Sequence, residues 1–156
     1  MPDSQMSRGN IRIGSLTTNE RELKDIIKAW VAISIAFAIV LSTNPNEFYL
    51  KLIIASLTVG IGFLLHELGH KIVAQKYGCS AEFKSFDHML ILAIAMSFFG
   101  VVFAAPGAVI ISGYVSKKRN GIISAAGPIL NLILALIFLE LSFLKLPGLL
   151  TDIAHY

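Results

Sequence analysis

The chain has 156 residues, of which 55% are hydrophobic and 15% charged, and its formal net charge is +3 at pH 7. Soluble domains average about 45–50% apolar and about 25% charged residues, so the composition excludes an ordinary soluble domain, a disordered chain and a collagen-like chain. The 13 basic residues lie in short polar gaps between long apolar stretches. That pattern indicates membrane orientation and not nucleic-acid binding. The single cysteine, Cys79, allows no internal disulfide.

Two apolar runs follow a polar start. Residues 1–25 are mixed in charge and have no small-residue cleavage pattern after an apolar stretch, so we expect a polar N-terminal arm and no signal peptide. The run from Ile26 to Leu41, interrupted by Lys28, predicts a first and rather short membrane helix. A second run, from Tyr49 to Ala74, predicts a membrane helix that carries ionisable groups within the lipid.

The second half of the chain predicts one re-entrant segment and one further span. Residues 77–88 are polar and basic and are interpreted as a connector. Residues 89–103 are almost wholly apolar, but 15 helical residues reach only about 22 Å of the roughly 30 Å that a crossing needs. After the break at Ala105–Gly107, residues 108–114 have a β-favouring composition, which predicts a short strand. Residues 122–144 predict a third membrane helix.

Together these segments predict an all-α membrane protein with three transmembrane helices plus a re-entrant apolar helix and a short strand segment. We divide it into a polar arm (1–25), a membrane-embedded core (26–148) and the start of an unfinished segment (149–156). With a cytoplasmic N-terminus, 11 of the 13 basic residues lie inside, and only Lys51 and Lys145 lie outside. The lack of a targeting segment suits a prokaryotic cell membrane.

His66, Glu67 and His70 spell H-E-x-x-H in the second predicted helix. Side chains at i and i+4 share one helix face, so both imidazoles can bind one metal ion, while Glu67 can act as general base on a metal-bound water. A charged group within lipid costs on the order of 2–3 kcal/mol, which favours a functional role and a bound zinc ion. The alternative is that both histidines are hydrogen-bonded packing residues and that Glu67 is protonated. Lys71 is interpreted as an interfacial side chain that snorkels to water.

Gly127, Pro128 and Asn131 form a second motif in the third predicted helix. Glycine permits close helix approach, proline frees a backbone carbonyl, and the asparagine offers an amide to another helix. Helix packing alone explains these residues as well as function does. In the membrane layout above, Asn131 and His66 both fall in the cytoplasmic half, so they could face each other.

HELGH at 66–70, the apolar segment 105–109 and the helix with the G-P-x-x-N motif resemble the site-2 protease family of intramembrane zinc metalloproteases over roughly residues 50–144. The resemblance implies His66 and His70 as zinc ligands, Glu67 as catalytic base, and Asn131 beside the active site or substrate, with Gly127 and Pro128 supporting it. The family's third ligand, an Asp in a motif of the kind N-x-x-P-x-x-D-G, is absent here. The missing ligand predicts a shortened chain that is catalytically incomplete.

Other potential ligands have plainer interpretations. Asp152 lacks the family's Pro and Gly context, His155 is close to the chain end, Asp87 and His88 suit a connector, and a lone Cys79 is usually a small buried residue.

We therefore expect an intramembrane zinc metalloprotease that hydrolyses peptide bonds of transmembrane protein substrates, with the lipid bilayer as its other partner. Residues 108–112 could pair with an unwound substrate as an added strand or could pack as an apolar loop. The main alternative is a noncatalytic membrane protein that binds metal or a partner helix through the same residues. A metal transporter is disfavoured because the other intramembrane ionisable groups, Lys28 and Glu140, lie near the ends of their spans.

Overall fold

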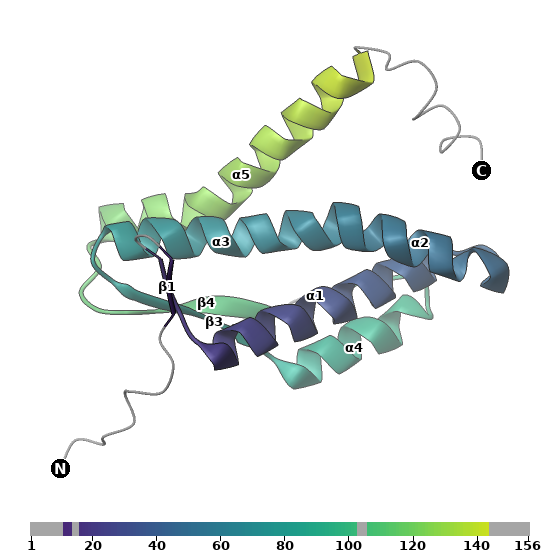
Figure 1. Cartoon of the computed structure of the whole chain (residues 1–156), viewed down its shortest axis with the longest axis horizontal. Helices are drawn as coiled ribbons and strands as arrows, with labels where there is room; N and C mark the ends of the chain where they lie inside the picture. Colours follow the sequence, from purple (N-terminus) through teal and green to yellow (C-terminus); the bar gives the residue numbers. More distant parts are fainter. Residues whose placement is uncertain (1–10, 14–15, 103–105, 144–156) are drawn as a thin grey trace.

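A computed structural model describes residues 11–13, 16–102 and 106–143, and most of these residues are helical (Figure 1). The elements in chain order are β1 (Ile11–Ile13), β2 (Leu16–Thr18), α1 (Glu20–Leu41), the 3-10 turn η1 (Pro45–Glu47), α2 (Phe48–Ala55), the π-helical turn η2 (Ser56–Gly60), α3 (Ile61–Lys76), β3 (Ser80–Ser85), α4 (Asp87–Ser97), β4 (Gly107–Ser112) and α5 (Lys117–Phe143). The segment predicted at 149–156, with Asp152 and His155, lies outside the described residues.

Two helices are long and apolar enough to cross a membrane: the continuous stretch Pro45–Lys76 and the stretch Lys117–Leu141. They correspond to the second and third predicted membrane helices. The first predicted span forms α1, which is not among the membrane-length helices. The reason is that α1 begins at Glu20, so its first turns contain charged residues. Asn19 sets this early start, since its side chain caps the helix by accepting the Glu22 N–H at 2.8 Å. The described residues therefore support two membrane-length helices and not three.

A strand lies within the segment that the sequence predicted to be a plain connector. β3 alternates exposed and buried side chains, with Ala81, Phe83 and Ser85 buried, and it pairs antiparallel with β4. The connector interpretation of residues 77–88 was therefore wrong for Ser80–Ser85, where the period-two pattern was readable in the sequence. The strand predicted over residues 108–114 is confirmed as β4.

The chain makes an excursion between these two strands and returns to its starting point. It leaves β3 into α4, which packs against α1 (Figure 1). It comes back at Pro106, whose carbonyl accepts the Phe86 N–H at 3.0 Å. An out-and-back path is the shape that the re-entrant prediction requires, and whether it enters lipid stays a prediction.

Two small cores hold the sheet between the helices. One joins α1, β3 and α4 around Phe83, which is 1% exposed, and the other joins α3, β3 and α5 around Ile123. The C-terminal half of α5 diverges from the rest of the protein in Figure 1. Its side chains there are mostly exposed and apolar: Leu132, Ile133, Leu136, Ile137, Phe138 and Leu139.

Lys71 does not snorkel to an interface. It is 5% exposed, and its ammonium lies 2.5 Å from the carboxylate of Glu22, which is 1% exposed. The prediction failed because α1 brings an anionic partner from 49 residues away, and nothing near Lys71 in the sequence indicates that partner.

Candidate metal centre

The two histidines of the H-E-x-x-H motif lie on successive turns of α3 and face α5. Their ring centroids are 4.8 Å apart and their planes meet at 80°. This geometry follows from the helical spacing of four residues, which puts both rings on one face.

Gly127 of α5 lies against both imidazoles. A Cβ placed on it would lie 2.8 Å from Nε2 of His66 and closer still to Nε2 of His70. Both Nε2 atoms therefore lie close to one point on the α5 backbone, where only glycine leaves room. Gly69, inside the motif, has a similar role, because a Cβ there would lie 2.7 Å from Cδ1 of Leu130. This role was not predicted from the sequence. Small residues on both helices thus allow α3 and α5 to approach closely.

The opposite nitrogens of the two rings also have partners on α5. Nδ1 of His70 lies 2.7 Å from the carbonyl oxygen of Ile123. A carbonyl only accepts, so this Nδ1 carries the proton and Nε2 keeps its lone pair for a ligand. Nδ1 of His66 lies 3.2 Å from Nδ2 of Asn131. Rotating the amide by 180° brings its oxygen to the same position, where it accepts Nδ1–H and leaves Nε2 of His66 free as well.

Glu67 points toward the sheet, beside the Val109 backbone of β4. Val109 is registered opposite Phe83, whose own N–H points away from β4 and donates to Glu22 at 2.9 Å. Facing residues in an antiparallel ladder share their hydrogen-bonding state, so the Val109 N–H also points out of the ladder, toward the side where Glu67 lies. Glu67 therefore lies between the histidine pair and the outer edge of β4.

Pro128 lies inside α5, one residue after the glycine that contacts the rings. Because proline has no N–H, the Ser124 carbonyl four residues earlier lacks its helical partner. The Pro128 side chain is exposed, and its supporting role in the site stays a prediction.

Among the residues that the structure describes, no group of three or more His, Cys, Asp or Glu side chains could hold a metal ion. Cys79 is buried in the apolar cluster with Ala74 and Ile123. Asp87 forms an ion pair with Lys28 at 2.5 Å. The histidine pair therefore offers two nitrogen donors, and no third His, Cys, Asp or Glu side chain joins it within the described part of the chain.

The site and the fold define a mainly helical protein with two membrane-length helices, in which an H-E-x-x-H helix packs on a glycine- and asparagine-bearing partner helix. The chain is 40% identical over 132 residues to a protein of Methanocaldococcus jannaschii provisionally named a zinc metalloprotease. The alignment covers 83% of this chain and 66% of that protein, so the chain spans somewhat less than two thirds of the relative's length. Neither a known family profile nor a solved structure matches the chain.

Proposed function

We propose that this chain is an integral membrane zinc metalloprotease of the site-2 type, which hydrolyses peptide bonds of transmembrane protein substrates. The observation that carries the proposal is the convergence of two imidazole Nε2 atoms at Gly127, with Glu67 beside them, on a helix long enough to cross a membrane. The homologue from M. jannaschii supports the metal and the reaction class through its name.

The donor set fits zinc. Neutral imidazoles are common zinc ligands, and hydrogen bonds from Nδ1 to a carbonyl or amide fix the tautomer that leaves Nε2 free. His70 has such a partner in Ile123, and His66 has one in Asn131. A catalytic zinc site usually has three protein ligands, so we propose that the third comes from outside the described residues.

The reaction then divides between the metal and the side chains. Zinc, when bound, makes a water nucleophilic near neutral pH and polarises a peptide carbonyl. Glu67 accepts the proton of the attacking water and returns it to the departing amine as the peptide bond breaks. Its place at the junction of the histidine pair and β4 puts the proton acceptor beside the strand where a substrate backbone can lie.

The sheet offers one edge to an added strand. The far edge of β3 is occupied by α1, because the Phe83 and Ser85 N–H groups donate to the carboxylates of Glu22 and Asp25 at 2.9 and 3.3 Å. On the outer edge of β4 the Val109 N–H faces Glu67, so an added strand would have to take over that donor, and the Ile111 N–H points to the same edge. A substrate helix has to unwind before its carbonyls are accessible, and pairing with β4 would hold the unwound segment extended next to the proton acceptor.

Metal removal tests the proposed function. The protein, placed in lipid vesicles, is expected to cleave a co-reconstituted transmembrane peptide, to lose that activity on chelation, and to regain it with zinc but not magnesium. Cleavage is followed by gel and mass spectrometry of the products. Bound zinc without cleavage would instead support a noncatalytic metal-binding protein, which the lack of a third ligand among the described residues favours.

Changing Asn131 to alanine is expected to weaken zinc binding by about 10–100-fold, because loss of a partner that orients a ligand has an effect of that size. The measurement is zinc affinity by competition with a chromogenic chelator. Asn120→Ala, at an exposed position in the first turn of the same helix, is the control and should bind zinc like the wild type. Equal affinities for all three proteins would remove Asn131 from the site.

Proline at Ile111 tests the strand edge. Ile111 lies two residues after Val109 on β4, so its N–H points to the same outer edge, and proline would remove that donor without removing a bond to β3. We expect the KM for the transmembrane peptide to rise by about fivefold or more, since one backbone hydrogen bond contributes roughly 1 kcal/mol. Ile111→Ala, which keeps the N–H, controls for the lost side chain. A KM equal for both variants would contradict pairing at this edge.

A further inference from the structure

One ridge of α3 faces the sheet along its whole length. Phe63, Glu67, Lys71 and Gln75 follow one another at intervals of four, the spacing of a helix ridge. The Phe63 ring packs edge-on against Phe83 of β3, with centroids 5.7 Å apart. The Gln75 amide donates to the Ala81 carbonyl of β3 at 3.2 Å. Glu67 thus lies between sheet contacts on either side of it along the ridge, while the histidines occupy the face toward α5.

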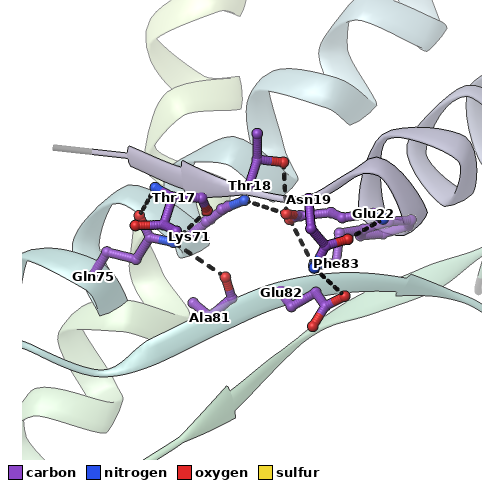
Figure 2. A network of polar contacts seen from close by, with 9 residues as sticks. All are labelled: Thr17, Thr18, Asn19, Glu22, Lys71, Gln75, Ala81, Glu82 and Phe83. Carbon is purple, nitrogen blue, oxygen red and sulfur yellow. Dashed lines mark hydrogen bonds and ion pairs between the residues drawn. The ribbon is translucent and has the colours of Figure 1, made fainter. Parts of the chain in front are cut away.

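Glu22 joins three segments at the centre of this contact (Figure 2). Its carboxylate accepts the Thr18 hydroxyl at 2.8 Å, the Phe83 backbone N–H at 2.9 Å and the Lys71 ammonium at 2.5 Å. Both members of the ion pair are almost fully buried, with side-chain exposures of 6% for Lys71 and 1% for Glu22. The first turn of α1 is therefore bonded at once to the segment before it, to β3 and to α3.

A buried ion pair is poor evidence of a stabilising role. Desolvating two charges offsets their attraction, and apolar pairs of similar volume often replace them with no loss of stability. A buried pair does define a position, because each charge has only one arrangement that satisfies it. Here the Glu22 carboxylate bridges Lys71, one helical turn from Glu67, to the Phe83 amide, and Phe83 is registered opposite Val109.

These contacts form a closed ring. It runs from Glu67 along α3 to Lys71, through Glu22 to Phe83, across the sheet to Val109, and back to Glu67. The ion pair is therefore one of the contacts that fix the Glu67 carboxylate relative to the edge of β4, together with the Phe63–Phe83 and Gln75–Ala81 contacts. The histidine pair lies outside this ring, because its contacts are with α5.

We propose that Glu22 and Lys71 are positioning residues that hold Glu67 at the edge of β4. The inference rests on the proposed function, in which Glu67 accepts a proton and β4 carries the substrate backbone. It assigns a part in turnover to the first turn of α1, whereas the contacts of both histidines lie on α5. Loss of the pair should displace the proton acceptor from the substrate and leave metal binding intact.

The test uses the full-length protein in lipid vesicles and two altered forms: the double variant Glu22→Leu/Lys71→Met, which fills the site with apolar side chains, and Glu22→Gln, which keeps an oxygen for the Phe83 amide. Their matched controls are Lys76→Met and Glu20→Gln, at exposed positions on the same two helices. The readouts are kcat and KM for the transmembrane peptide, zinc content, and hydrogen exchange of the segments 80–85 and 107–112.

We expect kcat to fall at least about tenfold in both altered forms, because small displacements of a reacting group have effects of this size. We expect KM to change by less than about threefold, since the substrate edge itself remains. Zinc content should be unchanged, and both strands should exchange faster. The controls should match the wild type in every readout.

Wild-type kcat and strand exchange in the folded double variant would overturn the inference and leave the proposed function intact. Parallel loss of zinc and kcat would also overturn it, because the pair would then maintain the fold as a whole. If the double variant does not fold, Glu22→Gln decides by the same readouts. Failure of the wild type to cleave would refute the proposed function itself, and that result is visible without any variant.

Discussion

Replacing Glu67 with glutamine is expected to lower peptide cleavage by about 10²–10⁴-fold, the contribution of a positioned general base. Glutamine has nearly the same shape but cannot accept a proton from the attacking water. Zinc should stay bound at the wild-type level, because Glu67 faces β4 while both imidazoles face Gly127 of α5. The measurements are initial rates on a transmembrane peptide in vesicles and zinc content of the same preparations.

Glu82→Gln is the matched control for this variant. Glu82 is an exposed carboxylate of β3 that accepts the Asn19 amide at 2.8 Å, so its loss tests whether any charge near the sheet affects turnover. Cleavage at the wild-type rate in the Glu67 variant would remove this residue from the mechanism. Loss of zinc together with cleavage would make Glu67 a ligand and not a base.

The centre of the site was predictable because helical spacing alone determines it. His66 and His70 share a face in any helix, and the apolar run around them predicts a helix. Their relation to Asn131 was suggested only by a depth argument that assumed a membrane layout, and the structure brings the two side chains to 3.2 Å. The roles of these residues and the orientation of the chain across a membrane remain predictions.

The contacts that hold Glu67 in place were not predictable from local patterns. Glu22 and Lys71 are 49 residues apart, and each looks like an ordinary charged residue within its own segment. The polar composition around Ser80–Ser85 concealed a strand, although every second side chain there is buried. The alternation of this strand was readable within its own segment, but the ion pair was not, because periodicity within one segment contains no information about a partner elsewhere.

Alanine at Gly127 is expected to weaken zinc binding by at least about 100-fold, the upper range for disturbing a ligand's surroundings. The added methyl group would occupy the point near which both Nε2 atoms lie, 2.8 Å from that of His66. The His70 ring cannot withdraw without losing its 2.7 Å contact with the Ile123 carbonyl. Alanine also favours helix over glycine by up to about 1 kcal/mol, so α5 itself should not unfold.

Gly121→Ala separates these two effects, because it lies in the same helix and a Cβ there meets no atom within 4 Å. It should raise the stability of α5 by up to about 1 kcal/mol and leave zinc affinity unchanged. Thermal unfolding in detergent and zinc titration of both glycine variants provide the comparison. If Gly127→Ala binds zinc as tightly as Gly121→Ala, the imidazoles do not converge at the α5 backbone. The helix α5 would then pack beside the site without shaping it.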